Sequence, residues 1–104
     1  MKMNKILFLP LKKEWYELIE KGIKTEEYRK IKPYWIRRLI IRKYKGNIMI
    51  DASFRDFEEI RFSYGYTKRT MTFKCDGIGI GKGNPEWGAP KEEVFIIKLG
   101  LRLI

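Results

Sequence analysis

The chain has 104 residues, of which 44% are hydrophobic and 35% are charged. This length allows one domain, predicted over residues 1–104, and the apolar fraction is too high for a disordered chain. The 23 Lys and Arg residues outnumber the 13 Asp and Glu residues, giving a formal charge of +10. Such an excess favours polyanionic partners such as RNA, DNA, nucleotides or an anionic membrane.

The missing residue types exclude several kinds of site. Histidine is absent, which rules out catalytic triads, general bases and metal sites built on imidazole. Cys75 is the only cysteine, so there is no internal disulfide and no paired-thiol site; its apolar neighbours indicate a packed strand residue. We therefore expect no metal, no other cofactor and a reducing, cytoplasmic location. The apolar run Ile6–Leu9 is too short for a signal peptide or a membrane span, so no membrane partner is predicted.

The start of the chain predicts a strand followed by a helix. Ile6–Leu9 indicates a buried strand, and Pro10 is expected to end it. Apolar side chains then recur at helical spacing and predict a helix over residues 11–21. Gly22 suits the left-handed conformation that commonly caps a helix at its C-terminus.

The next segment predicts a strand, a helix and another strand. We expect residues 25–31 to be extended. Pro33 is expected to open a short helix over residues 33–43, because proline suits the first helical turn and the residue before it avoids the helical region. Residues 46–47 (Gly-Asn) predict a turn, and the alternation that follows predicts a half-buried strand over residues 48–54.

The rest of the chain predicts strands joined by turns. A strand is expected over residues 57–63 and a loop over residues 64–69. The apolar parity then changes at residues 76–77 (Asp-Gly), which predicts a bulge or tight turn because a one-residue slip exchanges the two faces of a strand. Residues 81–91 predict a loop, and alternation over residues 95–103 predicts the last strand.

This order of elements indicates an α+β fold. We predict a small β-barrel or a curled mixed sheet with two short helices. The glycine-rich residues 76–84 (DGIGIGKGN) lack the Gly and the Ser or Thr that a phosphate-binding P-loop needs. They are expected to form a strand whose glycines admit another backbone or a ligand at close range.

The segment with most chemical content follows the first predicted helix. Gly22 is followed by Lys24, Thr25, Glu27 and Arg29, and on an extended strand the last three share a face. Lys24 and Arg29 can clamp an anion such as phosphate, with Arg supplying a planar fork. Glu27 can accept hydrogen bonds from a base or sugar, or serve as a general base. The alternative is an ordinary surface ion pair between Glu27 and Arg29.

The pattern Gly-x-Lys-x-x-Glu-x-Arg resembles the motif of the ASCH domains, relatives of the PUA-like β-barrels. Gly22, Lys24, Glu27 and Arg29 match all four of its fixed positions. The resemblance covers residues 5–31 well and is looser through the basic segment, the glycine-rich strand and the closing strand. It implies a PUA-like barrel with a cleft that the motif lines and that suits RNA or a nucleotide-like ligand.

A related branch of that family consists of small amidohydrolases that deacylate a modified cytidine with a lysine, a threonine and a distant glutamate. Lys24 matches the lysine, whereas Glu27 stands where the threonine would be and Thr25 is offset from it. Glu86 is a candidate for the distant glutamate because it lies in a loop beside Trp87. On this reading Lys24 and Glu27 are the catalytic candidates, and Thr25 and Glu86 are weaker ones.

Aromatic residues are interleaved with basic ones, as single-strand binding requires. Tyr64, Tyr66, Lys68 and Arg69 form one such stretch, in which the tyrosines are equally compatible with structural roles. Trp87, between turn residues, is expected either to form a rim of the cleft or to plug the end of the barrel. We count these five residues with the motif as binding candidates.

Three functions remain open at this point. The first is a module that binds RNA or a nucleotide-like ligand through Lys24, Glu27 and Arg29. The second is a metal-independent amidohydrolase that acts on an acylated, cytidine-like nucleoside, with water or Thr25 as nucleophile. The third is a protein-interaction domain whose charge is incidental. Composition and motif leave open RNA against DNA or free nucleoside, and the oligomeric state.

Overall fold

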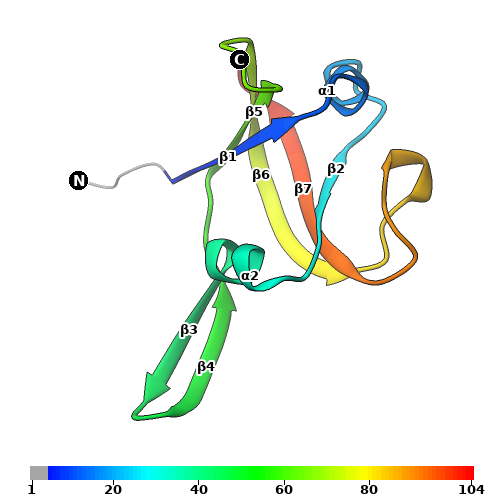
Figure 1. Cartoon of the computed structure of the whole chain (residues 1–104). Coiled ribbons are helices and arrows are strands. Elements are labelled where there is room, and N and C mark those ends of the chain that lie inside the picture. Colours follow the sequence, from blue (N-terminus) through cyan, green and yellow to red (C-terminus); the bar gives the residue numbers. More distant parts are fainter. Residues whose placement is uncertain (1–4) are drawn as a thin grey trace.

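The computed structural model describes residues 5–104, so the first residues of the predicted domain lie outside the described part (Figure 1). The elements in chain order are β1 (Ile6–Leu11), α1 (Lys13–Glu20), β2 (Glu26–Arg29), α2 (Pro33–Leu39), β3 (Ile40–Lys45), β4 (Ile48–Phe54), β5 (Glu59–Tyr64), β6 (Thr70–Gly81), the 3-10 helix η1 (Pro85–Trp87) and β7 (Val94–Arg102). No helix within residues 5–104 has the length and apolar character needed to cross a membrane.

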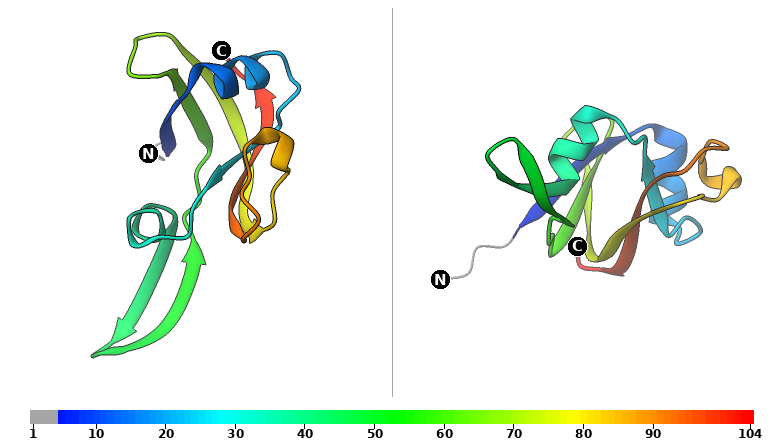
Figure 2. Two further views of the ribbon diagram at one scale, coloured as in Figure 1. Left: turned by 45° about the vertical axis from the view of Figure 1, so that its right-hand side comes forward. Right: turned by 90° about the horizontal axis from the view of Figure 1, so that it is seen from below.

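Five strands form one strongly curved sheet in the order β1-β5-β6-β7-β2 (Figures 1 and 2). β1 runs parallel to β5, and the other neighbouring pairs are antiparallel. β3 and β4 form a separate two-stranded hairpin. The predicted fold class, α+β with a curled mixed sheet and two short helices, is therefore confirmed.

The hydrophobic core lies between the inner face of the sheet and the helices. Alternate residues of four strands fill it, because successive side chains of a strand point to opposite faces. The strand residues are Leu7, Leu9, Leu11, Ile60, Phe62, Met71, Phe73, Phe95 and Ile97. Tyr16 and Ile19 of α1 and Leu39 of α2 complete the core from the helical side.

The first strand is longer and less buried than the sequence predicted. β1 continues through Pro10 to Leu11, and Phe8 is exposed. Proline is tolerated because β1 is an edge strand, where a ladder hydrogen bond is not required of every N–H group. Leu11 is therefore the last inward residue of β1 rather than the start of the helix, which begins at Lys13.

The second helix is shorter than the expected span of residues 33–43. α2 ends at Leu39, and the chain continues at once as β3. Ile40 and Ile41 are β-branched and favour a strand, and β4 pairs with β3 across the predicted turn at residues 46–47. Pairing with a strand formed later in the chain therefore overrides continuation of the helix.

The β3–β4 hairpin, Ile40–Phe54, is called the arm below. It projects from the body of the molecule, as Figure 2 shows. Every residue of β4 is exposed, so the prediction of a half-buried strand at 48–54 was wrong. The alternation is present, but only Phe54, at the base of the arm, makes an aromatic contact with the body, at Phe95.

The long strand β6 contains the predicted irregularity. Its register against β7 shifts between Cys75 and Gly77, and Gly77 adopts a φ of 126°, which favours glycine. The bulge lets Met71 and Phe73 face the core while the end of the strand continues along β7. Cys75 is half-buried against the core, in agreement with its interpretation as a packed residue.

Candidate functional site

The segment from Gly22 to Arg29 joins α1 to the edge strand β2. Gly22 has a φ of 78°. Its N–H donates to the carbonyl of Ile19 at 3.0 Å, and the N–H of Ile23 donates to the carbonyl of Leu18 at 3.0 Å. These two bonds define a Schellman cap, so the prediction for Gly22 is confirmed. The cap turns the chain back toward the sheet, where β2 pairs with β7.

Lys24, Glu27 and Arg29 form a continuous chain of ion pairs, called the triad below. Lys24 Nζ lies 3.1 Å from Glu27 Oε1, and Arg29 Nη2 donates to Glu27 Oε2 at 2.6 Å. The side chains of Lys24 and Glu27 are 1% and 7% exposed. Buried charges are tolerated only when paired and hydrogen-bonded, and here one carboxylate neutralises one of two cations. The triad therefore keeps a net charge of +1.

Arg29 also connects the two edges of the curved sheet. Its Nη2 donates to the carbonyl of Pro10 in β1 at 3.2 Å, and its guanidinium lies 4.9 Å from the centre of the Trp35 ring in α2. β1 and β2 are the edge strands of the sheet. The triad thus lies at the seam where the half-barrel remains open, and its arginine reaches both β1 and α2.

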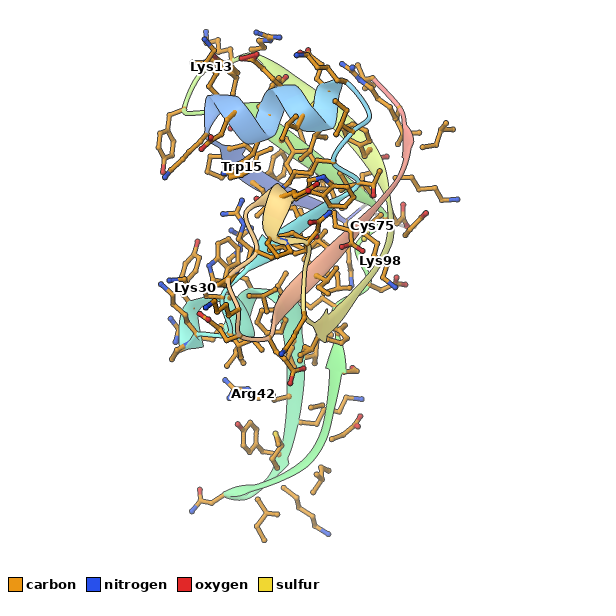
Figure 3. All side chains as sticks on the ribbon, turned by 90° about the vertical axis from the view of Figure 1, so that its right-hand side faces the viewer. Lys13, Trp15, Lys30, Arg42, Cys75 and Lys98 are labelled. Carbon is orange, nitrogen blue, oxygen red and sulfur yellow. The ribbon has the colours of Figure 1, made fainter. Side chains whose placement is uncertain are left out.

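Aromatic groups surround the ammonium of Lys24. Its Nζ lies 4.7 Å from the ring centre of Trp15 and 5.1 Å from that of Tyr28, both within cation–π range. It donates to the carbonyl of Trp87 at 2.5 Å. Figure 3 shows Trp15 between α1 and the segment around η1. Lys24 therefore connects η1 to α1 and β2.

These groups line a hollow of about 440 Å³ at the seam. Its volume falls within the range of roughly 300–1,000 Å³ typical of small-molecule sites. The wall combines the triad with aromatic rings and with residues of β1 and the 65–66 turn. The lining residues are Pro10, Leu11, Lys12, Trp15, Lys24, Glu27, Tyr28, Arg29, Gly65, Tyr66, Trp87 and Gly88.

Tyr28 fastens the glycine-rich loop to β2. Its hydroxyl donates to Glu26 at 2.8 Å and accepts the N–H of Asn84 at 2.9 Å. Burial and the Glu26 carboxylate raise the pKa of Tyr28 to about 12, against the opposing effect of the Asn84 N–H. A Cβ at Gly83 would lie 2.5 Å from the Tyr28 ring, so glycine is needed for this approach. The glycines were predicted to admit another backbone or a ligand within a strand, whereas the group that approaches Gly83 is a side chain and β6 has already ended at Gly81.

Six of the candidates named from the sequence lie outside the hollow, namely Gly22, Thr25, Tyr64, Lys68, Arg69 and Glu86. The side chain of Thr25 is exposed, and only its carbonyl is used, by the N–H of Leu99. Glu86 is exposed and lines a more open depression beside α1. Lys68 is exposed, whereas Arg69 pairs with Glu20 at 3.0 Å and stacks on the ring of Tyr64.

Several lining residues were not predicted from the sequence. Trp15 falls within the helix predicted over residues 11–21, and alternation along an extended strand turns Tyr28 to the face opposite Glu27. Both nevertheless line the hollow. The position of Trp15 on α1, shortly before the motif, was a usable signal. Nothing in the sequence indicated that Lys12 would line the hollow. Gly88, with a φ of 92°, admits the Trp15 ring where a Cβ would lie 2.8 Å from it.

Comparison of the chain with protein-family models, with curated proteins and with solved structures gives no match. The resemblance to ASCH domains therefore rests on the sequence pattern alone. Within residues 5–104, no group of three His, Cys, Asp or Glu side chains is placed to hold a metal ion.

Proposed function

We propose that this protein binds one nucleotide unit, free or within an RNA strand, in the hollow at the seam of the sheet. The observation that carries the proposal is the joint placement of the triad and four aromatic side chains around a single cavity of about 440 Å³. A nucleotide offers matching chemistry: a flat base, polar base edges and an anionic phosphate.

The aromatic side chains supply the stacking surface. Tyr66 is 97% exposed at the rim of the hollow, whereas Trp15 and Trp87 are half-buried in its wall. Stacking of a base on such a ring contributes ~1–3 kcal/mol and tolerates any base. A ring that is fully exposed at a cavity rim has no structural contact to lose, which favours a role for Tyr66 in binding.

The triad supplies polar recognition. Each oxygen of Glu27 is paired with one cation and, with two lone pairs per oxygen, can accept a further hydrogen bond from a base or sugar donor. Arg29 Nε is buried and has no acceptor among residues 5–104. Buried polar groups are almost always satisfied, but this nitrogen is closed to solvent, so we assign polar recognition to the Glu27 oxygens.

Charge at the rim supports binding of a phosphate. The triad has a net charge of +1, and the exposed Lys12 adds a second positive charge at the mouth of the hollow. Lys24 itself is enclosed by Glu27, Trp87 and two rings. We therefore assign phosphate contact to Lys12 and Arg29, and to Lys24 the positioning of Glu27 and the η1 segment.

The test measures the affinity of the four ribonucleoside monophosphates and the matching nucleosides by the fluorescence of Trp15 and Trp87. Tyr66→Ala should weaken binding by about tenfold or more, from the stacking lost, and Arg29→Lys should weaken monophosphates more than nucleosides because the planar fork is lost. Phe8→Ala, at an exposed aromatic residue of β1 outside the hollow, is the matched control. The proposal fails if no monophosphate binds or if Tyr66→Ala and Phe8→Ala behave alike.

One observation favours a second candidate, the amidohydrolase. Lys24 and Glu27 form a buried pair at 3.1 Å on the wall of the hollow, which is an arrangement that can move a proton. Water would add to the carbonyl carbon of an acylated cytidine, the C–N bond would break, and the departing amine would take up a proton. Water is the nucleophile we assign, since the exposed Thr25 is not among the lining residues.

Release of cytidine from N-acylated cytidine, followed by chromatography, tests this candidate. Turnover that Lys24→Met abolishes, with urea unfolding showing that the variant is folded, would support it. If acylated cytidine binds and remains intact, the protein is a binding module alone.

A further inference from the structure

The positive charge of the chain is concentrated in one region. Residues 30–55 contain eight Lys and Arg residues and a single acidic residue, Asp51. The rest of the chain contains 15 Lys and Arg residues against 12 acidic ones. α2, the arm and the residues that flank them therefore carry +7 of the formal charge of +10.

The cationic side chains of this region are available to a partner. Seven of the eight are exposed, namely Lys30, Lys32, Arg37, Arg42, Lys43, Lys45 and Arg55. None takes part in the ion pairs formed within residues 5–104. Figure 3 shows Lys30 near α2 and Arg42 on the arm, apart from Trp15 on α1.

Stacked side chains connect this region to the hollow. The Trp35 ring lies 4.9 Å from the guanidinium of Arg29, a lining residue of the hollow, and 5.4 Å from that of Arg38. Arg38 also lies 5.9 Å from the exposed Tyr34 ring. The stack runs from the seam along α2, and α2 passes directly into β3.

We infer that α2 and the arm form a second contact surface, which binds the sugar–phosphate backbone of a single-stranded nucleic acid. This inference rests on the proposed function in one respect: the nucleic-acid strand that the second surface binds is the one that places a nucleotide in the hollow. Phosphate contacts from Lys and Arg supply affinity independent of sequence. Exposed Tyr34 and Tyr44 offer stacking surfaces along the same path.

Charge distribution favours nucleic acid over the other occupants of an exposed hairpin. Ile48, Met49 and Ile50 give the arm an apolar tip, which a membrane or a second copy of the chain could cover. The cations, however, extend from the arm to α2 and toward the hollow instead of gathering behind the tip. Two copies paired through this region would also bring two surfaces of the same sign together.

The experiment compares two triple variants that lose the same charge. The arm variant is Arg42→Gln, Lys43→Gln and Lys45→Gln, and the control is Lys74→Gln, Lys91→Gln and Lys98→Gln, all at exposed positions. Each is titrated with a single-stranded RNA of roughly 12 nucleotides, within the usual span of single-strand sites, and with a ribonucleoside monophosphate over a range of salt concentrations.

Loss of three phosphate contacts should weaken RNA binding by the arm variant about 100-fold near 0.1 M salt and make the slope of log K against log salt shallower by about 2. The control should differ from the original protein by less than about threefold. Monophosphate affinity should be the same in all three proteins. Urea unfolding confirms that both variants are folded.

The inference is overturned if the arm variant and the control bind the RNA equally. It is also overturned if the arm variant loses binding to phosphatidylserine vesicles while its RNA affinity is unchanged. The hollow is tested separately: if the original protein binds RNA in an arm-dependent way but no monophosphate, the second surface stands and the proposed function fails. If monophosphates bind and the arm variant binds RNA as tightly as the original protein does, the proposed function stands and the second surface fails.

Discussion

Within residues 5–104, charged side chains are paired in the triad but unpaired on the arm. In the triad, the buried Lys24 and the partly buried Arg29 each contact Glu27, because a charge removed from water requires a partner. On the arm, Arg42, Lys43 and Lys45 are exposed and make none of the ion pairs found within residues 5–104, since water already solvates them. Burial therefore makes pairing obligatory in the triad, whereas the cations of the arm are free to meet a partner.

The same contrast holds for apolar side chains. β4 and β7 both contain isoleucines in alternating patterns, yet Ile50 is 62% exposed and Ile97 is fully buried. β7 lies within a five-stranded sheet and packs against the core, whereas β4 pairs only with β3. Apolar alternation describes a strand; whether the strand is buried depends on what packs against it.

The largest effect is expected from removal of the carboxylate in the triad. Glu27→Gln leaves the buried Lys24 and the partly buried Arg29 without a counter-charge and should lower the free energy of unfolding by about 3–5 kcal/mol. Glu20→Gln, which removes the partly exposed partner of Arg69, should cost less than about 1 kcal/mol. Urea unfolding measures both, and equal losses would show that burial does not distinguish the two pairs.

Truncation of one isoleucine in the body and one in the arm should lower stability by different amounts. Ile97→Ala creates a cavity in the core and should destabilise the protein by about 2–5 kcal/mol. Ile50→Ala removes an exposed side chain and should change stability by less than about 0.5 kcal/mol. The midpoints of urea unfolding give the comparison. A loss of about 1.4 kcal/mol or more for Ile50→Ala, which is tenfold in the folding equilibrium, would mean that the tip of the arm is packed in solution.

The smallest effect concerns pH. Burial raises the pKa of Tyr28 to about 12, above the value near 10 of an unfolded tyrosine. The folded protein thus keeps a proton that the unfolded chain has lost, so this contribution to stability is complete below about pH 10 and disappears as pH rises toward 12. In Tyr28→Phe, the decline of unfolding free energy over this window should be shallower. Identical declines would show that Tyr28 titrates normally.

Local signals predicted much of the fold. The α1 helix, its cap at Gly22, the turn at residues 46–47, the bulge at Gly77 and the closing strand β7 each depend on residues close together in the chain. Predictions failed where a distant segment decides the outcome. β3 is a strand because β4 pairs with it, and β1 continues past Pro10 because it lies at a sheet edge.

The triad was predicted from the sequence, whereas the full lining of the hollow around it was not. The spacing of Lys24, Glu27 and Arg29 indicated three groups that converge, since a helix cap and an alternating strand set their directions over a short distance. The hollow around them needed Trp15 of α1 and Trp87 of η1, which are far apart in the sequence. No local pattern reports that these two residues line one cavity.

The amino-acid sequence thus determined the charges, the α+β class and the motif, because these follow from composition and from neighbours within a few residues. Tertiary structure decided which charges are buried and paired, which strand projects as an arm, and where the seam of the sheet encloses a cavity. These outcomes depend on packing between remote segments, and packing depends on the shape of the whole chain.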